Sequence, residues 1–103
     1  MHRMTIWYAV PEDPAGFDER YRSEHVPLVL PVPGLRAFTW SWPRSLGGPQ
    51  TVHLVAELDF DDAEALQAAL RSPEMTTAAE HAAGLGTAMT MFSGEVVAAG
   101  AQG

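Results

Sequence analysis

The order in which extended and helical segments alternate is the feature that most constrains the fold of this chain. Four segments are rich in β-branched and aromatic residues and are predicted to be strands. The strands are expected at residues 4–10, 35–42, 51–60 and 87–97. A first helix is expected from Pro14 up to the breakers Pro31, Pro33 and Gly34, and two short helices in series at residues 62–83. The predicted order is therefore βαββαβ.

This order predicts an α+β fold. Right-handed crossovers place both helical regions on the same face of a four-stranded antiparallel sheet, which is the ferredoxin-like arrangement. A chain of 103 residues is the length of one domain. We expect a single domain over residues 1–97, followed by a flexible tail at 98–103 that has nothing to pack against.

The second face of the predicted sheet has no cover within the chain. The first strand, M-T-I-W-Y-A-V, is apolar on both of its faces, so either Trp7 or Tyr8 must lie on the uncovered side. Burial against a second copy would remove this apolar surface from water. The sequence therefore predicts a homodimer whose sheets pack face to face into a dimeric α/β barrel, burying about 800 Å² per partner or more.

The first helix carries the candidate site. Phe17, Tyr21 and His25 follow one another at four-residue steps, which places them on one face of a helix. Pro27 has no N–H and would press against the carbonyl of Ser23, so the helix is expected to kink within a turn of His25. A titratable ring beside a kink indicates the wall of a pocket.

His25 is the predicted catalytic residue. Its ordinary pKa of about 6.5 is close to neutral pH, which suits a general acid or base. The alternative is a capping or core histidine bonded to a backbone carbonyl. An apolar cavity for a flat ligand is expected from aromatic and methionine side chains, although core packing alone would explain each of them. These predicted substrate-binding residues are Tyr21, Tyr8, Phe38, Trp40, Met89 and Met91.

The remaining polar motifs receive structural interpretations. Asp61 and Glu64 form the Asp-x-x-Glu pattern of a capping box, while Asp13 and Ser72 each precede a proline that can begin a helix. Three further histidines are assigned no chemistry. His2 is expected at a mobile terminus and His81 on a solvated helix face. His53 and Glu57 are expected to share a strand face, too far apart for direct contact, and to form polar pairs at the dimer interface.

Composition excludes several classes of function. The net charge is −7, from 13 acidic residues against 6 arginines, so neither nucleic acid nor an anionic membrane is an expected partner. The absence of Lys and Cys removes Schiff-base and thiolate chemistry. No metal-ligand spacing and no phosphate-binding loop is present, so no metal or cofactor is expected. The apolar run before Pro11 is too short for a signal peptide, and a cytoplasmic location is expected.

Three blocks of the sequence, F-D-E-R-Y-R-S-E-H-V-P-L, P-G-L-R and V-A-E-L-D-F-D-D-A-E-A-L-Q-A-A-L-R-S-P-E, resemble the EthD family of small dimeric α/β-barrel proteins. The resemblance spans roughly residues 3–97. The family motif Phe-x-x-x-Tyr-x-x-x-His-x-Pro-Leu falls on Phe17, Tyr21, His25, Pro27 and Leu28, whereas Arg20 stands where many family members have a second histidine. Relatives in the wider superfamily resemble cofactor-independent monooxygenases, polyketide cyclases, isomerases and haem-degrading enzymes.

Two hypotheses of function follow. In the first, the protein is a cofactor-independent enzyme in which His25 transfers a proton on a small aromatic or polyketide-like substrate, in a cyclisation, dehydration, isomerisation or oxygenation. In the second, a non-catalytic dimer binds a hydrophobic metabolite for a partner enzyme. A dimer with a filled interior and no ligand is a third possibility.

Overall fold

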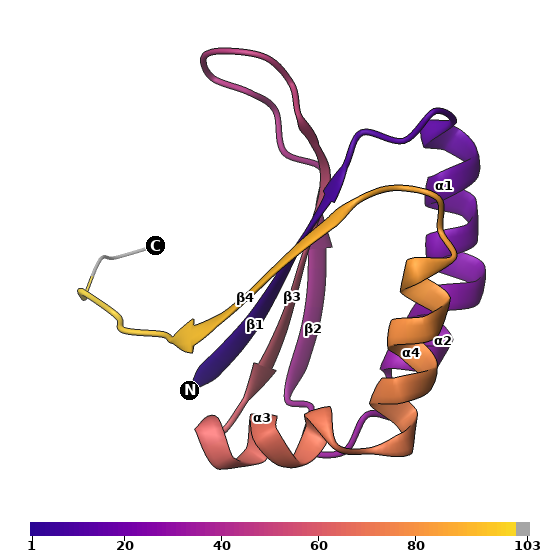
Figure 1. The fold of residues 1–103 in the computed structure, drawn as a ribbon. Helices are drawn as coiled ribbons and strands as arrows, with labels where there is room; N and C mark the ends of the chain where they lie inside the picture. The colour runs from indigo at the N-terminus through magenta and orange to yellow at the C-terminus, as the bar shows by residue number, and fades with distance from the viewer. Residues whose placement is uncertain (101–103) are drawn as a thin grey trace.

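The computed structural model describes residues 1–100, so the last three residues of the expected tail, 101–103, lie outside the described part. Figure 1 shows a sheet with the helices gathered on one side. The elements follow the predicted order, and the first helix is divided by a π-helical turn, η1. Their bounds are β1 His2–Ala9, α1 Pro14–Arg20, η1 Tyr21–His25, α2 Val26–Val29, β2 Ala37–Ser41, β3 Val52–Phe60, α3 Ala63–Leu70, α4 Pro73–Ala83 and β4 Met89–Glu95.

The sheet has the order β2-β3-β1-β4, and every pair of neighbours is antiparallel. The predicted α+β, ferredoxin-like fold is confirmed. β1 lies in the centre, where Ile6 is opposite Ala56 of β3 and Met91 of β4. β1 also begins earlier than predicted: His2 is paired with Phe60 and Glu95, so the expectation of a mobile terminus at His2 is wrong. Backbone pairing on both sides holds this end of the chain.

The core lies between the helices and the covered face of the sheet (Figure 1). Tyr8, Leu54 and Phe60 are fully buried, as is Leu66 of α3. Phe17 and Tyr21 fill the same layer from the first helix, as their spacing predicts, and the Tyr8 ring packs edge-on against both.

The uncovered face of the sheet carries Trp7 and Phe92, which are 42% and 46% exposed. Their rings contact each other edge-on at 4.9 Å across β1 and β4. The sequence prediction that Trp7 or Tyr8 must lie on this side is therefore confirmed for Trp7. The charged groups near it are paired: Arg3 binds Asp59 at 2.7 Å and Glu57 at 3.2 Å.

A β-bulge changes the position of His53. Tyr8 pairs with Leu54 but Ala9 pairs with Val52, which leaves His53 as the extra residue of β3. The bulge turns its ring toward α1, where Nε2 lies 2.8 Å from Oδ1 of Asp18. His53 therefore lies on the helical side, whereas Glu57 binds Arg3 on the uncovered face, so the prediction that the two share a face is wrong.

The helix starts are mostly where the sequence places them. Asp13 accepts the N–H of Gly16, and Ser72 accepts the N–H of Met75. The cap of α3 is Asp62, which accepts the N–H of Ala65 at 2.8 Å, and not the predicted Asp61. β3 continues to Phe60, so Asp61 lies in the turn and its carboxylate binds Arg36 instead.

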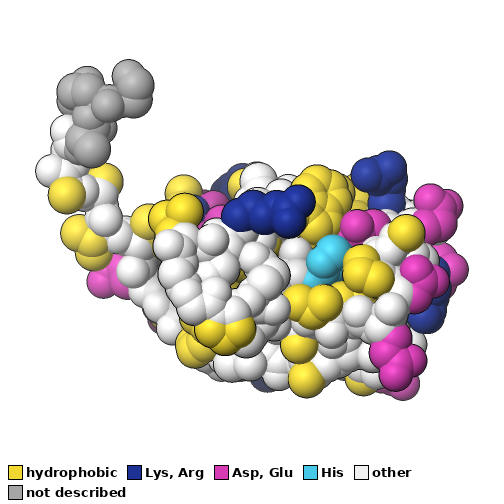
Figure 2. Space-filling model, turned by 90° about the horizontal axis from the view of Figure 1, so that it is seen from above, with side chains coloured by type: hydrophobic (Ala, Val, Ile, Leu, Met, Phe, Trp, Pro, Cys, Tyr) yellow, Lys and Arg dark blue, Asp and Glu magenta, His cyan; other side chains and the backbone are white. Residues whose placement is uncertain are grey.

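Seen from above in Figure 2, acidic side chains gather on the helical side of the molecule. Among residues 1–100, no helix combines the length and the apolar character needed to cross a membrane.

Candidate functional site

The site begins with the π-helical turn η1. The N–H of Val26 donates to the carbonyl of Tyr21, five residues back, so this turn holds one residue more than an α-helical turn. The widened turn directly precedes Pro27, whose ring would press on the carbonyl of Ser23 in a regular helix. The predicted disturbance near His25 thus takes the form of a π-turn, with Tyr21 and His25 at its two ends and both buried.

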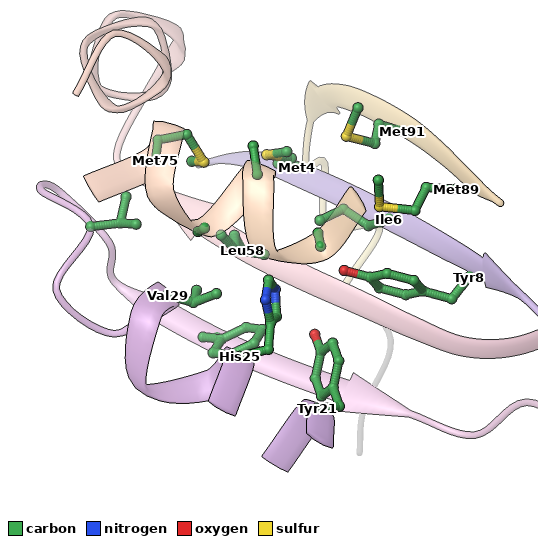
Figure 3. Close-up of a pocket in the computed structure, with 15 residues that line it drawn as sticks. Met4, Ile6, Tyr8, Tyr21, His25, Val29, Leu58, Met75, Met89 and Met91 are labelled. Atoms are coloured by element: carbon green, nitrogen blue, oxygen red, sulfur yellow. The ribbon is translucent and has the colours of Figure 1, made fainter. Parts of the chain in front are cut away.

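A cavity of about 160 Å³ lies between this helix, α4 and the sheet (Figure 3). Its wall contains one imidazole and two phenols, and all the other lining side chains are apolar. Four of these apolar side chains are methionines, which adapt their shape to a ligand. The lining residues are Met4, Ile6, Tyr8, Tyr21, His25, Val29, Val32, Phe38, Leu58, Met75, Ala78, Ala79, Ala82, Met89 and Met91.

The structure brings most of the predicted ligand-binding residues to this cavity. Tyr8, Tyr21, Phe38, Met89 and Met91 all line it, together with His25. Trp40 is outside the wall: its ring packs edge-on against Tyr21 at 5.7 Å and at a tilt against Phe38 at 5.5 Å. Trp40 therefore supports the two rings that face the cavity.

His25 is 3% exposed, and its ring stands between the first helix and α4 (Figure 3). Its Nδ1 lies 3.0 Å from Nδ1 of His81, so the hydrogen-bond partner is a second imidazole and not the backbone carbonyl considered above. Burial lowers the pKa of His25 to about 4, and the nearby His81 adds to this shift. The ring is therefore neutral at pH 7.

His81 is the residue that the sequence analysis missed. Its Nε2 lies 3.2 Å from Oε1 of Glu24, and its other nitrogen faces His25, so the prediction of a solvated helix face is wrong. The buried residues of α4 include Met75, Ala78 and Ala82. His81 follows Ala78 by three positions, which places it at the edge of the buried face. That periodicity was the available signal.

Tyr8 contributes an unusual polar atom. Its hydroxyl is fully buried and has no hydrogen-bond partner among the described residues. Burial raises the pKa of Tyr8 to about 12, although the neighbouring Tyr21 hydroxyl opposes the rise. Burial also raises the pKa of Tyr21. Both phenols are therefore protonated at neutral pH and can donate a hydrogen bond into the cavity. Their hydroxyl groups are visible in Figure 3.

Within residues 1–100, no group of three or more histidine and carboxylate side chains converges closely enough to hold a metal ion. His25, His81 and Glu24 form a chain of contacts, in which each nitrogen or oxygen faces the next residue. Such a chain can orient or transfer protons.

A ferredoxin-like domain with an apolar cavity beside a helix-borne histidine is the class of protein that this geometry defines. A sequence model described as the EthD domain matches residues 10–85. A protein of Rhodococcus erythropolis, described as an uncharacterized 11.0 kDa protein in the thcB-thcC intergenic region, is 42% identical over 80 residues, which are 77% of this chain and 78% of the relative. The chain therefore belongs to the EthD family.

Solved structures agree with this assignment. A crystal structure of an EthD family protein from Bacillus halodurans is 32% identical with a TM-score of 0.82, over 94% of this chain and 99% of the other. SnoaB, described as a cofactor-independent oxygenase from Streptomyces nogalater, is 17% identical with a TM-score of 0.72, over 98% and 97% of the two chains. At that identity the second likeness concerns the fold alone.

Proposed function

We propose that this protein is a cofactor-independent enzyme that moves a proton on a small aromatic or polyketide-like carbonyl compound bound beside His25. The proposal rests on one observation. Two polar groups in the wall of an otherwise apolar cavity lack a hydrogen-bond partner among the described residues. Among the described residues, the Tyr8 hydroxyl has no partner within hydrogen-bond distance, although the Tyr21 hydroxyl is near enough to affect its pKa. The Nδ1 atom of His25 is engaged by His81, which leaves its Nε2 without a protein partner in the described part of the chain.

The size and lining of the cavity support a small, flat ligand. A volume of about 160 Å³ is similar to the ~150 Å³ of an engineered apolar cavity that binds benzene. A ligand with one carbonyl group would supply the missing acceptor for Tyr8, whereas a charged ligand would lose its hydration without finding an opposite charge in the wall. Phe38 and the methionines would contact the faces of the ring.

The proposed reaction uses Tyr8 and His25 together. The ligand carbonyl accepts a hydrogen bond from Tyr8, and the C–H or phenolic O–H beside it gives its proton to Nε2 of His25. The electron pair left on the substrate becomes an enolate or phenolate, whose negative oxygen the Tyr8 hydroxyl stabilises. Return of the proton at another atom of the enolate completes an isomerisation. In a cyclisation, the enolate carbon first bonds to the carbon of a second carbonyl group of the substrate, and the oxygen of that carbonyl takes the proton back. The apolar wall excludes water, which strengthens each of these interactions.

The enzyme is proposed to act as a homodimer. Trp7 and Phe92 form an exposed aromatic pair on the uncovered sheet face, where the neighbouring Arg3 is ion-paired with Glu57 and Asp59 of its own chain. Packing this face against a second copy would bury about 800 Å² per partner or more, the size of a stable interface. The likeness to a cofactor-independent oxygenase supports chemistry without a cofactor on this fold, while the residues of the cavity favour proton transfer.

A non-catalytic binding protein is the second candidate. It is favoured by the lowered pKa of His25, which makes the ring a weak base by itself. In that case His25 would orient the ligand with one hydrogen bond, and His25→Ala would weaken binding by about 1 kcal/mol without changing any reaction.

The methionines provide a direct test of binding. We would label the Met methyl groups with ¹³C and titrate the protein with 2-indanone, a flat ketone with exchangeable hydrogens beside its carbonyl. The methyl signals of Met4, Met75, Met89 and Met91 should shift, while Met1, which is 58% exposed and outside the cavity, should not. Equal shifts at all five, or none at the four, would contradict a ligand site here. Deuterium exchange into the recovered ketone then separates the enzyme from the binder.

A further inference from the structure

We propose that Glu24 and His81 form a proton relay that keeps Nε2 of His25 unprotonated toward the cavity and carries the abstracted proton to the protein surface. This inference rests on the proposed function, because it concerns how His25 acts as a base. Within the relay, His25 is the catalytic residue, and His81 and Glu24 are positioning residues.

The three contacts determine which nitrogen carries a hydrogen. Glu24 is an exposed carboxylate and can only accept, so Nε2 of His81, at 3.2 Å, is the donor of that bond. A neutral imidazole has one N–H, so Nδ1 of His81 is then the acceptor. Nδ1 of His25, 3.0 Å away, must therefore be the donor. Its own remaining nitrogen, Nε2, is left with a lone pair.

The neighbours of Glu24 keep its carboxylate in this position. Arg20 lies 3.8 Å from the same carboxylate oxygen, and its guanidinium also donates to the carbonyl of Gly84 at the end of α4. Arg20 and Glu24 thus hold the C-terminal end of α4 against the first helix. Glu80, beside His81 in the sequence, is exposed and has no contact with the relay.

The relay avoids the energetic cost of a positive charge on the buried His25 ring. A cationic His25 would be costly in a buried site, as its lowered pKa shows. When Nε2 takes a proton from the substrate, the Nδ1 proton of His25 can pass to Nδ1 of His81. His25 is then neutral again with its hydrogen on Nε2, His81 is an imidazolium, and the substrate carries the balancing negative charge.

The surroundings of His81 can stabilise the positive charge that it would receive. His81 lies in the last turn of α4, where the unpaired carbonyls of the helix end stabilise positive charge. Its Nε2–H faces the Glu24 carboxylate, and its side chain is 19% exposed. From there the proton can be lost to water or returned along the same path. The cavity itself never has to hold a charged imidazole.

The test is the tautomer of His25, read from ¹⁵N signals of the ring at pH 8 with no ligand present. We expect the Nδ1–H form in the wild-type protein, whereas a histidine in water favours Nε2–H. In His81→Ala the acceptor is lost and His25 should return to Nε2–H. In Glu24→Ala, His81 is no longer held in the Nε2–H form, and the His25 signals should show a mixture of the Nδ1–H and Nε2–H tautomers. Glu80→Ala is the matched control and should leave the spectrum unchanged.

A His25 ring in the Nε2–H form in the wild type, or a tautomer that neither Glu24→Ala nor His81→Ala alters, would overturn the relay. Glu24 is exposed, so its variant gives a result even where His81→Ala does not fold. The expected loss of exchange activity in Glu24→Ala is on the order of tenfold, part of what a general base contributes. If the tautomer is as expected but no ketone is exchanged, the proposed function fails and the chain of hydrogen bonds stands. If exchange occurs with the other tautomer, only the relay fails.

Discussion

Burial of His25 couples the stability of the folded protein to pH. The pKa of His25 is lowered to about 4 in the folded chain and returns to about 6.5 when the chain unfolds. Between these values the unfolded chain binds a proton that the folded chain does not. The free energy of unfolding should therefore fall as the pH is lowered from about 6.5 to about 4.

We expect His25→Gln to reduce this pH dependence, because Gln cannot take up the proton. Urea unfolding of both proteins at neutral pH and near pH 5 measures the difference. A wild-type protein that loses no more stability than His25→Gln over this interval would show that His25 is not buried as described.

Tyr8 permits a second test at the residue scale. Its hydroxyl is buried without a partner among the described residues, so it is desolvated without compensation. Tyr8→Phe should leave the protein equally stable or more stable, by up to about 1 kcal/mol, while weakening binding of a ketone. Urea unfolding and the methyl titration measure the two effects. A stability loss above about 1 kcal/mol would contradict this prediction, because it would show that the Tyr8 hydroxyl makes a stabilising hydrogen bond in the folded protein.

At the residue scale, the sequence predicts what lies on one helix better than what two helices bring together. Phe17, Tyr21 and His25 are placed on one face by their spacing alone, and all three are buried. The contact between His25 and His81 joins residues 56 positions apart. Local periodicity places each ring near the core, but it does not specify how α4 crosses the first helix.

At the scale of elements, the start of α4 depends on its N-cap residue, Ser72. The Ser72 hydroxyl accepts the N–H of Met75 at 3.1 Å and donates to the carbonyl of Ala69 at 2.6 Å, and the residue is buried. Ser72→Ala removes both bonds and should cost about 1–2 kcal/mol of stability. Thr77→Ala, on the exposed side of the same helix, is the matched control and should cost less. Urea unfolding compares them, and equal losses would contradict the cap.

Helix boundaries are predicted well where a cap and a proline coincide. Ser72 and Gly84 bound α4 as their residue types indicate. The cap of α3 is misplaced by one residue because D-D offers two carboxylates, and only the length of β3 decides between them. The bulge at His53 and the π-turn before Pro27 each insert one residue into a regular element. Periodic patterns assume regular elements, so they assign His53 to the wrong face.

At the scale of the whole molecule, the uncovered sheet face determines the expected assembly. Trp7→Asp or Phe92→Asp places a charge in the proposed interface and should convert a dimer to a monomer. Leu46→Asp, in the loop between β2 and β3 and fully exposed, is the control and should remain dimeric. Sedimentation measures the mass, and circular dichroism checks the fold. A monomeric wild-type protein would contradict the dimer.

The fold was predictable at this scale because the order of elements and the rule of right-handed crossovers leave few arrangements. The cavity was predictable only as a group of apolar residues. Its volume and its two unpartnered polar groups depend on side-chain packing between α4, the first helix and the sheet, and no sequence pattern specifies that packing.

The most direct test of proton transfer in the cavity is deuterium exchange into a bound ketone. 2-Indanone is incubated in D₂O with the wild-type protein or His25→Gln, after methyl shifts have shown that both bind it, and deuterium beside the carbonyl is measured by NMR. We expect the wild-type protein to accelerate exchange by about two to four orders of magnitude more than His25→Gln. Binding to both proteins with equal exchange rates would contradict the account and leave a binding protein.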